Sequence, residues 1–246
     1  MEYRPYYLAQ QWIKSGHKVT IIASSFSHVR SVQPDVVRNT EIHEIGGVHY
    51  LWIKTRPYRG NSVKRFINIL EFVLKLYLKK KFIVRNFKPD LVVASSTYPL
   101  DIYPAANISK KAGAKLIYEI HDLWPLSPME IGGYSKYHPF IMLMQAAENY
   151  CYKHSEVVIS ILPKTLEHCV AHGLQADKWH HIPNGISLEE MKNQMEIPLK
   201  QKKEIEEIRL RYKYLVGYTG SIGMANALDA FVLSAKIMDD KQIALV

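Results

Sequence analysis

The sequence is poor in cysteine: its 246 residues include two, Cys151 and Cys169, which lie 18 positions apart and have no CxxC partner. This usage excludes a disulfide framework and predicts buried thiols in a reducing compartment. The neighbouring His180 and His181 do not combine with these cysteines at zinc-ligand spacing, so the sequence assigns no metal.

Long apolar runs are also absent. No stretch reaches the roughly 18 apolar residues that a transmembrane helix needs. The N-terminal MEYRPYYLAQQW lacks a basic segment followed by an apolar core, so no secretory signal is predicted. We expect a cytoplasmic protein; peripheral attachment to the inner face of the plasma membrane is an alternative that its charge distribution raises.

Positive charge is concentrated in one part of the chain. The net charge is +9, and eleven Lys or Arg lie between Lys54 and Lys88 against one acid, Glu71. The remainder is close to neutral. This distribution argues against a protein that binds nucleic acid over its whole surface.

Short apolar segments alternate with helical segments along most of the chain. Strands are expected at residues 18–24, 40–45, 48–54, 89–96, 114–122, 155–161, 179–182 and 215–219. Helices are expected at residues 5–15, 63–87, 99–112, 136–154 and 163–172. This alternation is typical of βαβ units, and it predicts an α/β fold with parallel strands covered on both faces.

The turn Pro183-Asn184-Gly185 marks the expected end of a first Rossmann-like domain, 1–185. The polar stretch 186–213 is predicted as a linker, and 214–246 as the start of a second domain. Both ends are expected to be truncated: the first strand and glycine loop do not precede residue 1, and 214–246 holds one βαβ unit, which cannot bury its own apolar faces.

The segment YEIHDLWP places His121 and Asp122 at the carboxyl end of a predicted strand. Ligands of open α/β sheets bind at this edge. An imidazole there could donate a hydrogen bond to a hydroxyl or phosphate, or move a proton. A turn that caps the next helix explains the same residues, and both interpretations stay open.

The segment YTGSIG, residues 218–223, joins a strand to a helix through Gly220, Ser221 and Gly223. Small residues at this position allow a diphosphate to approach backbone N–H groups. The segment is neither a Walker A motif nor G-x-G-x-x-G, so taken alone it fits a tight turn without a ligand somewhat better.

The segment 63–88 is predicted to be an amphipathic helix rich in positive charge. Its apolar positions Phe66, Ile69, Leu70, Val73, Leu76 and Tyr77 recur at intervals of three and four. Its basic residues favour either a solvated helix face or a surface that docks on anionic lipid. These candidate membrane-binding residues are Lys64, Arg65, Lys75, Lys79, Lys80, Lys81 and Arg85.

Several of these segments, in this order, resemble the family 4 glycosyltransferases, whose GT-B fold pairs two Rossmann-like domains. The segments that carry the resemblance are EYRPYYLAQQWIKSGHKVTIIA, LIYEIHDLWP, VVISILPKTLEHCVAHG, HIPNGIS and VGYTGSIG. Within that family, the sequence looks like the bacterial enzymes that build O-antigen lipopolysaccharide or capsular polysaccharide, including N-acetyl-fucosamine-type transferases.

The resemblance implies a role for each matching residue. His121 would face the donor sugar as the catalytic residue, and Gly220, Ser221 and Gly223 would meet the diphosphate of the donor. Arg4 and Asp122 would lie near the acceptor or a phosphate. The family transfers a sugar from a nucleotide sugar, here expected to be a UDP-sugar, with retention and without a bound metal or other cofactor.

The family's Arg/Lys pair and Glu-x7-Glu motif do not occur within 1–246, so the isolated chain is expected to show negligible turnover. Two other hypotheses remain: a non-catalytic module that binds a membrane surface or a lipid-linked or saccharide acceptor, and a nucleotide-sugar epimerase of GT-B shape. EIHD and IPNGI fit the transferases better than the epimerases.

Overall fold

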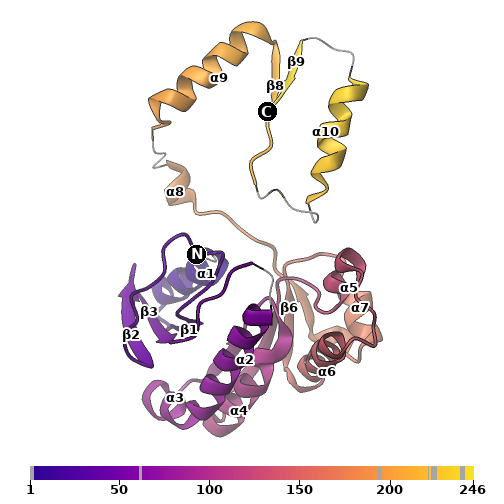
Figure 1. The fold of residues 1–246 in the computed structure, drawn as a ribbon. Helices are drawn as coiled ribbons and strands as arrows, with labels where there is room; N and C mark the ends of the chain where they lie inside the picture. Colours follow the sequence, from indigo (N-terminus) through magenta and orange to yellow (C-terminus); the bar gives the residue numbers. More distant parts are fainter. Residues whose placement is uncertain (1–2, 61–62, 193–195, 221, 223–225, 239–241) are drawn as a thin grey trace. The chain divides into compact units, whose positions relative to one another are not determined.

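The computed structural model describes residues 3–60, 63–192, 196–220, 222, 226–238 and 242–246 (Figure 1). The chain divides into two units, Met1–Gly185 and Ile186–Val246. Each unit has its own sheet hydrogen bonds, and each is described separately.

The first unit begins with a small mixed sheet of order β1-β3-β2. β1 (Thr20–Ser24) pairs parallel with β3 (Val48–Ile53), whereas β2 (Thr40–Ile45) pairs antiparallel with β3. Gly46 and Gly47 make the turn with φ of +56° and +80°. β2 is therefore an exception to the parallel pairing that the sequence predicts, because two glycines that accept positive φ allow a tight hairpin.

A second sheet of the same unit is fully parallel, with the order β4-β5-β6-β7. Its strands are β4 (Leu91–Ala94), β5 (Lys115–Ile120), β6 (Val157–Ser160) and β7 (Trp179–His181). Each is reached through helical structure, as the alternation in the sequence predicts. Parallel pairing brings the carboxyl ends of all these strands to one edge of the sheet.

The two sheets share no hydrogen bonds among the strands that the structure describes. β1 pairs with β3 alone and β4 pairs with β5 alone, so each is an edge strand. Edge strands expose unpaired backbone N–H and C=O groups.

Helices pack on these sheets and supply the core. α1 (Tyr3–Lys14) packs on β1 and β3 through the fully buried Ala9. The predicted single helix at 63–87 is instead two helices, α2 (Val63–Leu78) and α3 (Lys80–Phe87). The chain bends at Lys79, and this bend lets both helices contact α4.

α4 (Ile102–Ala112) follows a 3₁₀ turn, η1 (Pro99–Asp101), and ends at Gly113 in the left-handed conformation. α5 (Leu126–Gly132) is a short helix that the sequence did not predict. The remaining helices of this unit are α6 (Pro139–His154), α7 (Leu166–Ala171) and the 3₁₀ turn η2 (Ala176–Lys178).

The main core lies around the parallel sheet. Its buried side chains come from β4, β5, β6, α4, α6 and α7, and they include Ala94, Ile102, Leu116, Tyr118, Ile120, Cys151, Tyr152, Val158 and Cys169. Both cysteines are free and buried, as the sequence predicts. Large apolar residues at alternate positions of β5 fill one face, which explains the fixed register of that strand.

The second unit has fewer strands and helices than the first. It contains α8 (Leu188–Lys192), α9 (Leu199–Arg211), β8 (Tyr214–Val216), α10 (Leu228–Ile237) and β9 (Ile243–Leu245). β8 and β9 form a parallel pair. No residue described between 186 and 246 is buried. Across the described parts of both units, no helix combines the length and apolarity needed to cross a bilayer.

Candidate active site

The candidate active site is centred on His121, which directly follows β5 at the carboxyl edge of the parallel sheet. The strand therefore delivers His121 to the position that the sequence predicts. Nε2 of His121 lies 3.0 Å from Oε2 of Glu119 and 2.9 Å from Oγ of Ser95. Ser95 directly follows β4, the neighbouring strand, so two strand ends build this cluster.

Glu119 is the buried centre of the cluster. It stands two residues before His121, and alternate residues of a strand share one face. Its side chain is 4% exposed, and it accepts a 2.5 Å hydrogen bond from Ser95 and an ion pair from Arg4 at 3.0 Å. Burial by itself raises the pKa of Glu119, but the hydrogen bonds from His121 and Ser95 and the charges of His121 and Arg4 lower it to about 2. Glu119 is therefore a carboxylate at any physiological pH.

Arg4, in the first turn of α1, ties this carboxylate to the end of the first unit. Besides its Nε contact with Glu119, it donates from Nη2 to the carbonyl oxygen of Ile182 and from Nη1 to that of Pro183, both at 2.8 Å. Nη1 also lies 3.3 Å from Oδ1 of Asn184. Most of its five N–H donors are thus engaged within the protein. Arg4 positions other groups, and little of it is left to hold a ligand.

The donor and the acceptor of each hydrogen bond among Ser95, Glu119 and His121 follow from the ionised state of Glu119. Ser95 donates its hydroxyl proton to Glu119, so its oxygen can accept from His121. An ionised carboxylate only accepts, so Nε2 of His121 is the protonated nitrogen. Nδ1 of the neutral imidazole is then a lone-pair acceptor. His121 can therefore accept a hydrogen bond at Nδ1 from a bound hydroxyl.

Asp122, a predicted acceptor or phosphate residue, is held in a local turn. Its Oδ1 accepts a 2.5 Å hydrogen bond from Ser127 and its Oδ2 accepts from Nε1 of Trp124 at 3.3 Å. These contacts join the end of β5 to the start of α5. Each carboxylate oxygen of Asp122 thus has a partner within the turn, which agrees with the interpretation of this segment as a turn.

The predicted diphosphate loop belongs to the second unit. Gly220 follows β8, whereas Ser221 and Gly223 lie outside the described residues. A Cβ built on Gly220 would stand 2.6 Å from the hydroxyl of Tyr218. A larger residue at this position would force the Tyr218 side chain to move.

The predicted membrane-binding residues lie on α2, α3 and the bend between them. Lys75 is committed to an ion pair with Glu71 at 2.8 Å and to the carbonyl oxygen of Lys54. Lys80 lies over the ring of Tyr77, with 3.5 Å between Nζ and the ring centroid. Arg65 and Lys79 are partly covered, and the exposed members of the set are Lys64, Lys81 and Arg85.

Sequence reasoning missed Glu119 and Ser95. The signal for Glu119 was available, since a carboxylate two positions before a strand-end histidine shares its face. Ser95 could not be found this way, because its proximity depends on the parallel register of β4 beside β5. Long-range contacts of Arg4 with 182–184 are likewise invisible in a single sequence.

The chain is similar to two solved structures that indicate its fold. The sucrose-phosphate synthase from Thermosynechococcus elongatus is 14% identical, with a TM-score of 0.66, over 97% of this chain and 54% of that chain. HepE of Anabaena, solved in complex with UDP-glucose, is 15% identical, with a TM-score of 0.50, over 78% of this chain and 46% of that one. This chain therefore spans about half the length of the structures that it matches.

These likenesses and the sheets described above define an α/β protein of the GT-B class. Residues 1–190 match the Glycosyltransferase Family 4 profile, and the chain belongs to that family. No curated protein matches the sequence at a significant level.

Proposed function

We propose that this chain contributes the acceptor-side domain of a glycosyltransferase that takes its sugar from a UDP-sugar. The observation that carries the proposal is the His121–Glu119–Ser95 cluster at the carboxyl edge of β5, in a chain of family 4. Ligands of open α/β sheets bind at that edge. The UDP-glucose in the complex with HepE adds support for the class of donor.

In the proposed reaction an acceptor hydroxyl attacks the anomeric carbon of the donor sugar. The bond from that carbon to the diphosphate oxygen breaks, and the electron pair and the hydroxyl proton leave with the UDP. Nδ1 of His121 accepts a hydrogen bond from a donor-sugar hydroxyl, and Glu119 orients the imidazole through its contact with Nε2. We infer that the configuration of the anomeric carbon is retained, because the sequence segments resemble those of a family that transfers sugars with retention.

The test measures UDP release and sugar transfer from a panel of UDP-sugars with saccharide and lipid-linked acceptors. His121→Ala removes the imidazole, and His17→Ala, an exposed histidine after α1, is the matched control. Since turnover by the chain alone is expected to be negligible, any transfer that is detected should be lost in His121→Ala and retained in His17→Ala. The imidazole resonances of both histidines, followed by NMR during donor addition, report binding even where turnover is too slow to detect.

A selective shift of the His121 resonance supports the proposal. If UDP-sugars and acceptors leave that resonance unchanged and no UDP is released, the site does not serve sugar transfer. Transfer at the same rate in His121→Ala and in the unmodified chain would place the chemistry elsewhere.

A role in building O-antigen or capsular polysaccharide is the finer proposal, and it requires an acceptor at a membrane. Its structural support is an exposed apolar stripe on α2 that lies opposite the buried Ile69, Phe72 and Leu76. This stripe is formed by Ile67, Leu70, Leu74, Tyr77 and Leu78. Leu70 and Tyr77, two of the apolar positions that recur at helical spacing, are 40% and 38% exposed.

The apolar stripe of α2 and the exposed basic residues of α2 and α3 suit an anionic lipid surface. Apolar side chains would enter the headgroup region while Lys64, Lys81 and Arg85 meet lipid phosphates. Each basic residue near such a surface contributes about 1 kcal/mol. We propose that this face docks the domain on an anionic membrane.

Liposome sedimentation tests the docking. Replacing Lys64, Lys81 and Arg85 with Ser should weaken binding to anionic vesicles by up to about 100-fold, at about 1 kcal/mol per charge. The matched control replaces Lys200, Lys202 and Lys203 of α9 with Ser, which removes the same charge elsewhere. Equal loss in both variants would mean that net charge alone drives binding, and equal affinity for neutral vesicles would contradict docking on anionic lipid.

A further inference from the structure

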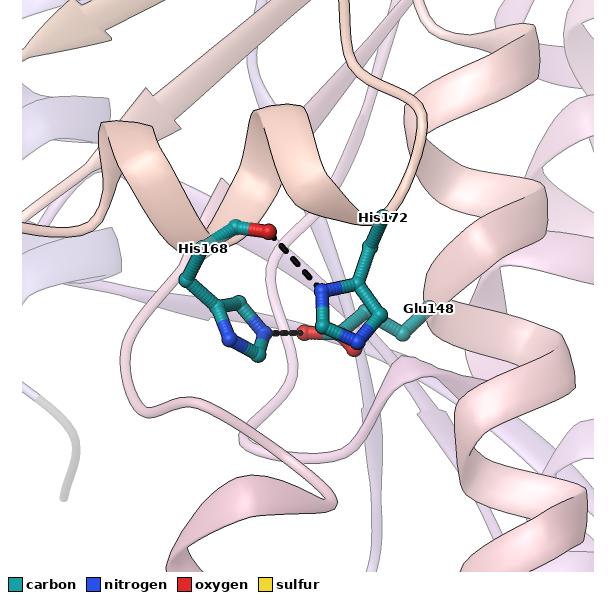
Figure 2. A group of neighbouring side chains, drawn as sticks. All are labelled: Glu148, His168 and His172. Atoms are coloured by element: carbon teal, nitrogen blue, oxygen red, sulfur yellow. Dashed lines mark hydrogen bonds and ion pairs between the residues drawn. The ribbon is translucent and has the colours of Figure 1, made fainter.

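A second cluster of ionisable side chains, none of which belongs to the His121 network, joins α6 to α7. It consists of Glu148 on α6, His168 on α7 and His172 immediately after α7. One carboxylate oxygen of Glu148 and one nitrogen of each imidazole all lie within 4.8 Å of one another. Figure 2 shows both imidazoles turned toward the carboxylate.

Glu148 is the buried anchor of this cluster, with a side chain that is 1% exposed. Its Oε1 accepts from Tyr152 at 2.9 Å, and its Oε2 accepts from Gln145 at 2.7 Å. These two donors fix the carboxylate in place, as groups around a metal ligand commonly do. Oε1 also makes a second hydrogen bond, with Nε2 of His168 at 2.9 Å.

His172 has the tautomer that a metal ligand requires. Its Nδ1 lies 2.8 Å from the carbonyl oxygen of His168, so Nδ1 carries the proton and donates it (Figure 2). The neutral ring therefore has a bare lone pair on Nε2. Metal-binding histidines typically donate their other N–H to a backbone carbonyl in this way. Among the described residues, none makes a hydrogen bond with Nε2 of His172.

We propose that Glu148, His168 and His172 bind one Zn²⁺ ion that links α6 to α7. Two imidazoles and one carboxylate are a known zinc donor set, with water as the fourth ligand, and Mg²⁺ prefers oxygen ligands. Donors of a tetrahedral zinc ion at 2.0–2.1 Å lie roughly 3.3 Å apart. The two imidazole ring centroids are 4.2 Å apart, and the donor atoms must draw closer to bind one ion. Zinc binding also requires Nε2 of His168 to lose the proton that now faces Glu148, and this proton is released to solvent.

This proposal departs from the expectation, drawn from the sequence, of no metal. That expectation weighed the cysteines with His180 and His181, whereas His168 and His172 are one helical turn apart and Glu148 comes from another helix. An i, i+4 histidine pair places both rings on one helix face. The carboxylate completes the site only through tertiary packing.

The experiment titrates the EDTA-treated, dialysed protein with ZnCl₂ by calorimetry. We expect one ion per chain with a dissociation constant in the micromolar range or below, no uptake of Mg²⁺, and a Tm that rises with Zn²⁺ and returns with EDTA. Substituted Co²⁺ should show the visible absorption of a four-coordinate site. His172→Gln should weaken Zn²⁺ binding at least 100-fold, while circular dichroism without metal confirms that the variant folds.

The matched control is the double variant His180→Gln/His181→Gln, which removes two exposed histidines of β7. It should retain the stoichiometry and the affinity. Zinc binding that survives His172→Gln and disappears in the double variant would place the ion on β7 and overturn the proposal. Absence of any Zn²⁺ uptake would show that Glu148 and His168 are a metal-free ion pair, and this also overturns it.

Discussion

The two units of this chain use similar sequence patterns with different results. Met1–Gly185 contains every buried side chain that the structure describes, whereas Ile186–Val246 contains none. Both have strands joined by helices. In the first unit, helices pack on the sheets and bury apolar side chains, while in the second the apolar residues Leu210, Ile222 and Ile237 are 83% exposed or more.

A βαβ pattern in the sequence is thus enough to form strands and helices, but it does not by itself produce a buried core. Hydrophobic burial contributes about 25 cal/mol per Å² of apolar area, and it must offset the conformational entropy of the ordered chain. A pair of short parallel strands and a helix cannot bury enough area. We therefore expect the two units to differ widely in local stability.

The largest difference is expected in limited proteolysis. Trypsin should cut within 186–246, where α9 exposes Lys and Arg, more than about 100-fold faster than within 1–185, which corresponds to about 3 kcal/mol in local opening free energy. Mass spectrometry of the time course identifies the surviving piece. Cleavage at equal rates in both units would show that their local stabilities do not differ.

A pair of matched truncations tests the same difference in the core. Ile53→Ala, at a fully buried position of β3, should lower the free energy of unfolding by about 2–5 kcal/mol. Ile237→Ala, at an exposed position of α10, should change it by less than about 0.5 kcal/mol. All four tryptophans lie in 1–185, so urea unfolding followed by Trp fluorescence reports the first unit. A large effect of Ile237→Ala would contradict the exposure of this side chain.

The carboxylate of Glu119 should make the first unit sensitive to acid. Its pKa is lowered from 4.5 to about 2, so it stabilises the fold above pH 4.5 and this contribution is lost as the pH falls toward 2. The loss is on the order of 3 kcal/mol, at about 1.4 kcal/mol per pH unit. Unfolding by urea at a series of pH values measures it.

Glu119→Gln should flatten this pH dependence, and Glu130→Gln, at an exposed position of α5, should leave it intact. If both variants keep the same acid sensitivity, the ionisation of Glu119 does not contribute to stability.

The smallest effect concerns two i, i+4 ion pairs, one in each unit. Lys75 and Glu71 on α2 are 2.8 Å apart and largely covered, whereas Lys200 and Glu204 on α9 are 4.0 Å apart and exposed. Lys75→Gln should cost about 0.5 kcal/mol, and Lys200→Gln nothing measurable. High salt should reduce the first effect. Thermal unfolding by circular dichroism checks both, and equal effects would contradict the contrast between the units.

Much of the first unit could be predicted from the sequence. Segments such as 115–120 and 157–160 are apolar, short and flanked by turns, so the strand pattern is local. The bend at Lys79 and the antiparallel pairing of β2 with β3 were not predicted, because packing against α4 and the turn conformation of Gly46 and Gly47 decide them.

The site was predictable only in part. His121 follows a strand end, which is a local property, whereas the partners that orient it come from β4 and α1. Glu148 and the pair His168 and His172 show the same limit, since 20 residues separate Glu148 from His168. Contacts between elements depend on register and packing, and a single sequence records neither.

The contacts of Arg4 have a kinetic consequence. They span 178 to 180 residues, so they close nearly the whole first unit into one loop, and loop-closure entropy makes such contacts form late in folding. Interactions that are absent from the transition state slow unfolding and leave the folding rate unchanged. Arg4→Ala should therefore raise the unfolding rate in a chevron plot while the refolding limb stays in place. On this basis Arg4 sets how long the native first unit persists.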